Sequence, residues 1–272
     1  MTNKPFLKWA GSKYRVLPHI LPLIGSPKQY IEPFSGSMAV ALNVASDCMV
    51  LNDFNSDLIS LYRYVMNDEE FVDDCEKVCA DSNNQEVFYQ YRDIFNTTSD
   101  SRHKAILFIY LNRHCFNGLT RYNKKGQFNV PFGKYSSPYF PRKEMENFKE
   151  VFKQNQSVRM TAYDFAADEL YQNIDSNTVV YFDPPYLPIN DTAYFTDYAS
   201  CGFNYADQVR LRDLVLNLAN RGARVIVSNH DTPAARELYS SASLTTIDVS
   251  RTIAANKNSR EKVKELLAVW NS

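Results

Sequence analysis

The sequence predicts an α/β protein built on a doubly wound, mostly parallel sheet. Short β-rich runs end in polar or turn residues, which is how parallel strands lead into loops. Between and around these runs lie patterns with apolar residues three and four positions apart, as in amphipathic helices. With 272 residues, the chain is long enough for one large domain that carries a smaller insertion.

The predicted strands come first, because they place the candidate site. They are Gln29–Phe34, Cys48–Asn52, Thr178–Phe182 and Arg224–Ser228. Helices are predicted at Ser56–Asn67 and Ala206–Arg221, and Gly222 is placed to end the second helix. The pattern of Lys262–Trp270 fits a helix or a strand. Ligands of doubly wound sheets bind beyond the carboxyl ends of the strands, so the residues that follow each strand are the candidates.

The middle of the chain has a different character. Glu86–Asn96 and His103–Asn112 are predicted helices, whereas Arg113–Pro141 is aromatic, basic and rich in Asn, Gly and Pro. The apolar residues of this last stretch follow neither the period of a helix nor that of a strand over any length, so we expect a structured loop or hairpin. We therefore predict a helical domain of residues 61–156 inserted into a domain formed by residues 1–60 and 157–272.

Composition narrows the class of protein. The chain is 44% apolar and 14% aromatic, which predicts a sizeable core and argues against disorder. No apolar run approaches the roughly 20 residues that span a bilayer, and the start lacks the apolar core of a secretion signal. The five cysteines are scattered, which predicts reduced thiols in a cytoplasm. Cys75 and Cys79 are a close pair without a second pair or nearby histidines, so no metal site is predicted.

The net charge of −1 conceals an uneven distribution. Residues 101–143 hold nine Lys or Arg and no acid, and residues 1–31 hold five and no acid. This polarity predicts a basic face for a polyanion on an otherwise acidic body. The alternative is that acidic residues from elsewhere fold back onto the basic segments.

The strongest chemical signal follows the strand that ends at Phe182. Asp183-Pro184-Pro185-Tyr186 joins an acid, two prolines and an aromatic ring. Prolines have no backbone N–H, so the turn presents Asp183 and the Pro184 carbonyl as acceptors, with Tyr186 as a flat platform. This set suits a planar group that bears an NH2. The alternative is an ordinary turn at a strand end.

This tetrapeptide resembles the catalytic motif of amino-methylating DNA methyltransferases, in the aspartate form typical of adenine-N6 enzymes. Further segments resemble other motifs of the Dam-type family: Phe6–Lys13, Glu32–Ser37 (the cofactor motif), Asn117–Asn123 and Phe128–Gly133 (the recognition hairpin), Ser228–Thr232 and Arg251–Ile253. Their order is that of the family, over nearly the whole chain. The resemblance implies a Rossmann-like catalytic domain of residues 1–60 and 157–272 and a DNA-recognition domain of residues 61–156.

The resemblance also implies the reaction. S-adenosylmethionine would donate a methyl group to N6 of an adenine flipped out of duplex DNA, in the sequence GATC. Asp183 and the Pro184 carbonyl would accept hydrogen bonds from N6, and Tyr186 would stack on the base. The cofactor site would be lined by Trp9, Lys13, Phe34, Gly36, Asp53 and Asp183. Neither a metal, a membrane nor an obligate protein partner is implied, and the location would be a bacterial cytosol or a phage-infected cell.

In DNA recognition, the family pattern assigns base contacts to four residues. Lys8 would read the first guanine, and Arg121 the guanine paired with the last base, since arginine can bond O6 and N7 of guanine together. Leu119 and Pro131 would make apolar contact at the third pair.

Other residues would support the duplex. Phe116 and Asn117 would enter the space that the adenine leaves. Contacts to phosphates fix register without reading sequence, and the residues expected to make them are Arg92, Asn123, Lys134 and Tyr135.

The sequence departs from the family pattern at three positions, so two alternative functions stay open. Met38 stands at the second glycine of the cofactor motif, Phe116 where relatives often have tyrosine, and Ser12 replaces a glycine before Lys13. One rival is a catalytically silent DNA-binding relative with a spoiled cofactor site. Another is methylation of cytosine N4 or a glutamine amide in the same kind of pocket.

Overall fold

The computed structural model describes residues 2–80, 83–187, 203–250 and 262–271. The chain divides into two compact units. The first comprises Met1–Leu17, Ser35–Val44 and Asp53–Ala162, and the second Pro18–Phe34, Ala45–Asn52 and Tyr163–Ser272. The predicted division into a catalytic and a recognition domain is a division by function, and it stays a prediction.

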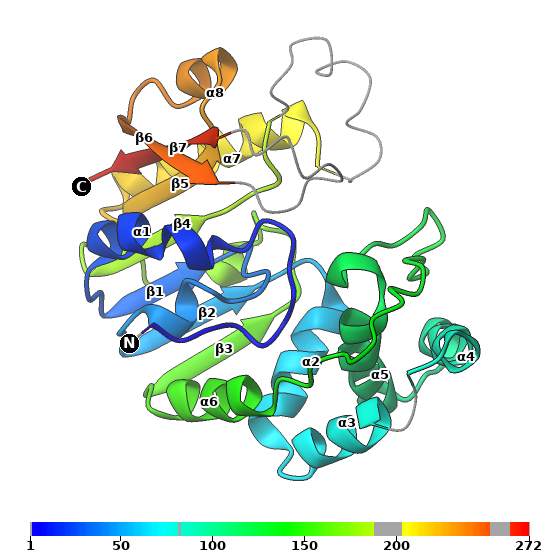
Figure 1. Cartoon of the computed structure of the whole chain (residues 1–272). Coiled ribbons are helices and arrows are strands. Elements are labelled where there is room, and N and C mark those ends of the chain that lie inside the picture. The colour runs from blue at the N-terminus through cyan, green and yellow to red at the C-terminus, as the bar shows by residue number, and fades with distance from the viewer. Residues whose placement is uncertain (1, 81–82, 188–202, 251–261, 272) are drawn as a thin grey trace. The chain divides into compact units, whose positions relative to one another are not determined.

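The second unit is built on a sheet whose strands lie in the order β2-β1-β4-β5-β7-β6 (Figure 1). Their bounds are β1 Gln29–Glu32, β2 Cys48–Asn52, β4 Thr178–Phe182, β5 Arg224–His230, β6 Ser243–Ser250 and β7 Lys262–Trp270. Strand β1 pairs in parallel with β2 and β4, β4 pairs in parallel with β5, and β7 runs antiparallel to β5 and β6. Strand β2 thus lies on one side of β1, and β4 and β5 lie on the other, as in a doubly wound sheet. The predicted α/β class is confirmed.

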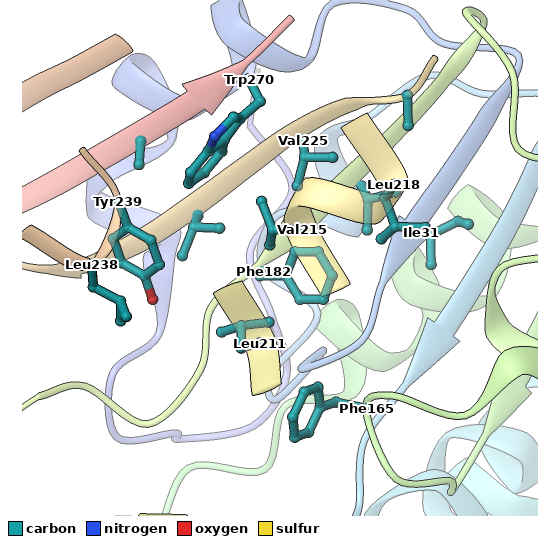
Figure 2. Packing of buried hydrophobic residues seen from close by; sticks show 14 of the residues in the cluster. Ile31, Phe165, Phe182, Leu211, Val215, Leu218, Val225, Leu238, Tyr239 and Trp270 are labelled. Atoms are coloured by element: carbon teal, nitrogen blue, oxygen red, sulfur yellow. The ribbon is translucent and has the colours of Figure 1, made fainter. Parts of the chain in front are cut away.

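One face of this sheet packs on helix α7 (Tyr205–Asn220). Leu211, Val215 and Leu218 of α7 are fully buried against Phe182 and Val225 of the strands (Figure 2). The helix begins with a capping box of Asn204 and Asp207, and Gly222 follows its end with φ +102°. Two shorter helices belong largely to this unit, α1 (Leu17–Ile24) and α8 (Pro233–Leu238).

The parallel register of β4 and β5 decides which residues meet on the other face. Tyr181 pairs with Ile226 and Phe182 with Val227. Because side chains alternate along a strand, the Asp183 side chain emerges on the same face as Tyr181, opposite to Phe182. The next step of the register brings Ser228 beside Asp183.

The first unit is mainly helical. Its elements are α2 (Ser56–Asn67), α3 (Phe71–Ala80), α4 (Gln85–Thr97), α5 (Ser101–His114), α6 (Arg142–Lys153) and strand β3 (Ser157–Thr161). Helix α5 contacts α2, α3 and α4, and its residues 105–114 are all buried (Figure 1). Helices α2, α4 and α5 start at Asn55, Asn84 and Asp100, whose side chains accept hydrogen bonds from first-turn amides.

The stretch after α5 is a loose hairpin, as predicted. Its two arms meet at the Cys115–Phe132 and Tyr122–Phe128 bridges. Its tip is closed by Asn123, whose side-chain oxygen accepts from the amides of Lys125 and Gln127.

Most predicted elements are confirmed, and several of their ends shift by one or two residues, as in β5, which continues to His230. The first strand ends at Glu32 and not at Phe34, because Pro33 lacks the N–H that a ladder needs. Lys262–Trp270, which the pattern left open, is a strand. Among the described residues, every helix is too short or too polar to cross a lipid bilayer. Arg251–Ile253 and Cys201 lie outside the described residues.

Candidate functional site

Five residues from Asp183 to Leu187 form the candidate catalytic turn, and three side chains of the second unit hold its backbone. The Gln208 side chain donates to the Pro185 carbonyl at 2.7 Å. The Asn229 side chain accepts from the Leu187 amide at 2.9 Å. His230 Nδ1 lies 2.6 Å from the Leu187 carbonyl, and since a carbonyl only accepts, this nitrogen carries the proton. The turn is therefore pinned on both sides of Tyr186.

The carboxylate of Asp183 is held by a neighbouring strand. Ser228 Oγ donates to Asp183 Oδ1 at 2.8 Å, and the Tyr181 hydroxyl lies 3.0 Å from Ser228 Oγ. Burial, and next the charge of Asp183, raise the pKa of Tyr181 well above its ordinary value, so Tyr181 keeps its proton. Ser228 has one proton and gives it to the carboxylate, so Tyr181 donates to Ser228.

Tyr186 is fixed at its hydroxyl end. This hydroxyl donates to Glu265 Oε2 at 3.1 Å, and the ring meets His230 edge-on with centroids 4.8 Å apart. Burial raises the pKa of Tyr186, and the charges of Asp183 and Glu265 raise it further. The ring itself is half-buried, which is suitable for a stacking platform beside the two acceptors.

In the first unit, Asp53 is the candidate for the ribose of an adenosyl group. Its Oδ2 accepts from the Gly36 amide at 3.0 Å and its Oδ1 from the Asn55 amide at 2.9 Å. Burial raises the pKa of Asp53, while these two amides act in the opposite direction. Each carboxylate oxygen can accept more than one hydrogen bond, so the geometry leaves room for a hydroxyl donor.

Gly36 sits where a larger residue would not fit. Its φ is +44°, and a Cβ there would lie 2.8 Å from Nε1 of Trp9. The Tyr62 hydroxyl donates to the Gly36 carbonyl at 2.7 Å. Lys13 is buried and donates to the Gly11 carbonyl at 2.9 Å. The structure thus brings Trp9, Gly36 and Asp53 together, with Lys13 on the same amino-terminal segment as Trp9.

Two departures from the family pattern now have a structural account. Met38 has φ +54°, so it adopts the left-handed conformation that a glycine adopts without strain, and its side chain is fully buried. Ser12 accepts a hydrogen bond from Ser37 Oγ at 2.9 Å, which ties the amino-terminal segment to the cofactor motif. Neither residue removes a polar group that the predicted site uses.

Two aromatic residues flank the cofactor motif in sequence. Phe34 is half-buried in the second unit and stacks on Phe165 with centroids 5.4 Å apart, beside Phe203. Phe54, which directly follows Asp53 in the first unit, is 80% exposed. Phe54 was not among the predicted site residues, and its position directly after Asp53 makes its exposed ring a candidate for the same site.

The first unit also brings Lys8 to the recognition hairpin. Asn112 of α5 accepts from the Lys8 amide at 3.1 Å and donates to the Lys8 carbonyl at 2.8 Å and to the Gly118 carbonyl at 3.1 Å. The Lys8 ammonium lies 4.3 Å from the centroid of the Tyr135 ring. Burial, and next the charge of Arg113, lower the pKa of Lys8. Asn112 was not among the predicted site residues, because it lies inside a buried helix.

The other residues predicted to contact bases or to enter the space of the flipped adenine lie along the same hairpin. Phe116 is 50% exposed and its amide donates to the Pro131 carbonyl at 2.8 Å. Asn117 is exposed with φ +55°. Leu119 is half-buried, and Arg121 is exposed with its Nε donating to Asn129 Oδ1 at 2.8 Å.

Some of the residues predicted to hold phosphates already make contacts within the first unit, whereas others are exposed to solvent. Arg92 lies over the Tyr89 ring at 4.6 Å, and its buried Nε has no hydrogen-bond partner in the described structure. Asn123 builds the hairpin tip, whereas Lys134 is exposed with φ +53°. The Tyr135 ring lies beside Lys8, so its position also serves a base-contacting residue.

The predicted basic face is smaller than the sequence indicated. Arg102 pairs with Asp68 and Asp74, Lys104 with Asp57, and Arg142 with Asp73, Glu76 and Glu146, so acids do fold back onto part of the basic segment. Arg113 is buried and donates to the Phe6 carbonyl. The exposed basic residues of the hairpin are Arg121, Lys124, Lys125 and Lys134. Within residues 101–143, Lys143 is the one further exposed Lys or Arg, so most of the exposed basic residues of this segment lie on the hairpin.

The thiols of the described cysteines are free. Cys48, Cys75, Cys79 and Cys115 carry unpaired thiols, and burial raises the pKa of Cys79 and Cys115 to about 12. Within the ranges that the structure describes, no three potential metal-binding side chains gather in one place.

Comparison with known proteins adds an independent line of support. The sequence model of a family described as D12 class N6 adenine-specific DNA methyltransferase matches residues 9–253. The DNA adenine methylases of Salmonella typhi and Escherichia coli K12 are each 43% identical to this chain over 270 residues, which cover 98% of the chain and 95% of each relative. The DNA adenine methylase of Vibrio cholerae O1 is 40% identical over 271 residues, covering 98% and 96%.

A solved structure, the precorrin-6y C5,15-methyltransferase of Geobacter metallireducens, covers 100% of this chain with 93% of its own length. The TM-score of 0.34 and the 9% identity are too low for this likeness to support a conclusion.

Proposed function

This chain belongs to the D12 class of N6 adenine-specific DNA methyltransferases, and from that membership we propose that it methylates the adenine of GATC on a base flipped out of the duplex. The observation that carries the proposal is the pinned Asp183 turn, which presents a fixed carboxylate beside a half-buried tyrosine ring. The relatives are bacterial, and we propose a bacterial cytoplasm or a phage-infected cell as the place of action.

The residues of the turn fit an adenine amino group. The N6 lone pair is delocalised into the ring, so it is a weak nucleophile until its hydrogens are held by acceptors. Asp183 and the Pro184 carbonyl would accept the two N6–H bonds, and Tyr186 would stack on the base. Because Ser228 and Gln208 hold the turn, these acceptors need little rearrangement when the base arrives.

The residues of the first unit fit the adenosyl part of S-adenosylmethionine, which supplies an electrophilic methyl group on a sulfonium centre. Asp53 offers carboxylate oxygens to ribose hydroxyls, and its raised pKa reflects its burial. Gly36 allows close approach of its backbone, Trp9 lies against it, and exposed Phe54 offers a ring to the adenine. Lys13 completes this set, and Phe34 and Asp183 are the proposed contributors from the second unit.

Recognition of GATC would come from the hairpin of the first unit. Lys8 would read the first guanine and Arg121 the guanine paired with the last base. Leu119 and Pro131 would contact the third pair, and Phe116 and Asn117 would enter the space of the flipped adenine. The phosphate contacts would be made by Arg92, Asn123, Lys134 and Tyr135. Asn129 supports this reading because it holds Arg121 Nε at 2.8 Å on the exposed face of the hairpin.

The decisive experiment is transfer of labelled methyl from S-adenosylmethionine to three matched duplexes. One contains GATC, one carries N6-methyladenine at that site on both strands, and one has its last base pair changed. Label in the first duplex alone supports the donor, the target atom and the site together. Label in the first and third shows that the site is broader than GATC, and label in none refutes the proposed function.

The role of Asp183 is tested by Asp183→Ala. We expect methyl transfer to fall by roughly a thousandfold or more while DNA binding persists. Full activity of the variant would refute the mechanism. Nucleoside analysis of the labelled product separates N6-methyladenine from N4-methylcytosine, and label on protein would indicate a glutamine amide.

The silent DNA-binding alternative depends on whether Met38 spoils the cofactor motif. Its positive φ keeps the backbone in the conformation of a glycine, which supports an intact site. Calorimetric titration of the protein with S-adenosylmethionine tests this directly. A clear binding isotherm supports the enzyme, and no detectable heat at millimolar donor would support the silent form.

A further inference from the structure

We propose that Ser228 is a positioning residue for methyl transfer, because its hydroxyl fixes Oδ1 of Asp183 and so sets the rotation of the carboxylate that faces the target amino group. The proposal rests on the proposed role of Asp183. It adds a residue from β5 that does not belong to the catalytic turn.

The first support is geometric. Ser228 Oγ lies 2.8 Å from Asp183 Oδ1 and 3.4 Å from the Phe182 carbonyl. Both of these atoms only accept, so the single proton of Ser228 goes to the nearer and charged carboxylate. A carboxylate turns readily about its last torsion, and one fixed oxygen removes that freedom.

The second support is the hydroxyl behind Ser228. Tyr181 lies 3.0 Å from Ser228 Oγ, and both residues are fully buried. Tyr181 keeps its proton and donates it, so two hydroxyls in series point toward Asp183. Such a series polarises the hydroxyl next to the charge and strengthens its bond to the carboxylate.

The third support is that the sheet enforces this arrangement. Tyr181 and Ile226 are partners in the β4–β5 ladder. Asp183 follows Tyr181 by two residues, and Ser228 follows Ile226 by two residues. All four therefore share one face, and the apolar face behind them is locked by α7. The ladder therefore fixes the backbone of Ser228 on the face where Asp183 lies.

The test measures the single-turnover rate of methyl transfer with saturating S-adenosylmethionine and a duplex that the wild type methylates. For Ser228→Ala we expect a loss of about 10- to 100-fold in this rate, with unchanged dissociation constants for donor and DNA. Ser228→Thr restores the hydroxyl and should return the rate to within about fivefold of the wild type. Tyr181→Phe, which leaves Ser228 in place, should cost about three- to tenfold.

The matched control is Thr178→Val, which removes another buried hydroxyl from the opposite end of β4. We expect its rate to stay within about twofold of the wild type, since distant sites act independently. An unchanged rate in Ser228→Ala, or an equal loss in Thr178→Val, would overturn the proposal. If Ser228→Ala does not fold, an unchanged rate in Tyr181→Phe overturns it instead.

The two failures can be told apart. A wild type that methylates no duplex refutes the proposed function. A wild type that methylates DNA and loses activity in Asp183→Ala, but not in Ser228→Ala, refutes the positioning role alone.

Discussion

Asn112 binds the backbone of Lys8 in both directions, since its side chain accepts from the amide at 3.1 Å and donates to the carbonyl at 2.8 Å. The same side chain donates to the Gly118 carbonyl at 3.1 Å. One buried amide thus joins the amino-terminal segment to the recognition hairpin. The position of a proposed base-reading lysine depends on a residue that is itself 1% exposed.

We expect Asn112→Ala to lower the free energy of unfolding by about 2–3 kcal/mol, because it leaves buried backbone groups without partners. It should also reduce discrimination at the first base pair of the site more than at the last. Urea unfolding and methylation of duplexes with each pair changed check both effects. Asn67→Ala is the control, since the Asn67 side chain donates to the Arg63 carbonyl in an exposed position. Equal effects of the two variants would contradict the prediction.

Gly118→Ala should cost more stability than Gly126→Ala, although both positions have positive φ. A Cβ at Gly118 would lie 2.4 Å from Cδ and 2.5 Å from Cβ of Lys8, whereas a Cβ at Gly126 meets nothing within 4 Å. Gly126→Ala should therefore cost about 1–2 kcal/mol for the left-handed backbone alone. The additional overlap in Gly118→Ala should add about 1–3 kcal/mol. Chemical unfolding measures the difference, and equal costs would show that Lys8 moves aside freely.

Met38→Gly should destabilise the protein without weakening donor binding. The variant loses a fully buried side chain, worth about 2–5 kcal/mol. It relieves a left-handed backbone strain of about 1–3 kcal/mol, so the centres of the two ranges give a net loss of about 1.5 kcal/mol. Thermal unfolding and calorimetric titration with S-adenosylmethionine check the two parts. A tenfold gain in donor affinity would mean that Met38 impairs the site.

His114 should make the protein less stable in mild acid. Its Nδ1 donates to the Tyr110 carbonyl at 2.8 Å, its Nε2 has no partner in the described structure, and burial lowers its pKa from 6.5. Between pH 6.5 and the lower pKa of the folded state, His114 is protonated in the unfolded chain but not in the folded protein. The free energy of unfolding therefore falls as the pH falls through this window.

His114→Phe keeps the ring that stacks on Tyr110 at 4.0 Å and removes the titrating group. Unfolding by urea between pH 7.5 and 5 should therefore show a weaker pH dependence for this variant. A wild-type slope retained in His114→Phe would assign the effect to another group.

Several elements could be predicted from the sequence because burial leaves a local pattern. The β2 and β4 ranges and helix α2 are confirmed at both ends. Helix α6 was missed although its buried residues Met145, Phe148 and Phe152 are three and four positions apart, which is the pattern of an amphipathic helix. Lys262–Trp270 was undecided because only its pairing with β5 and β6 makes it a strand.

The motifs of the site were predicted from the sequence, whereas the residues that hold the motif residues in position were missed. Asp183 and Asp53 could be predicted because each directly follows a predicted strand, where ligands of doubly wound sheets bind. Ser228 lies 45 residues from Asp183, and Asn112 lies 104 residues from Lys8. These partners meet only through strand register or helix packing, which no local pattern encodes. The basic face was overestimated for the same reason, since Arg102 pairs with Asp68 and Asp74, and Arg142 pairs with Asp73 and Glu76, all of which lie far away in the sequence.

The place of β7 between β5 and β6 has a consequence for the order of assembly on the ribosome. Strand β6 is synthesised before β7, but in the sheet it pairs with β7, which in turn pairs with β5. Strand β6 therefore cannot join this sheet until β7 has been synthesised. Glu265, which holds the Tyr186 hydroxyl, arrives on that same last strand. The nascent chain therefore cannot complete its stacking platform before residue 265 has emerged from the ribosome.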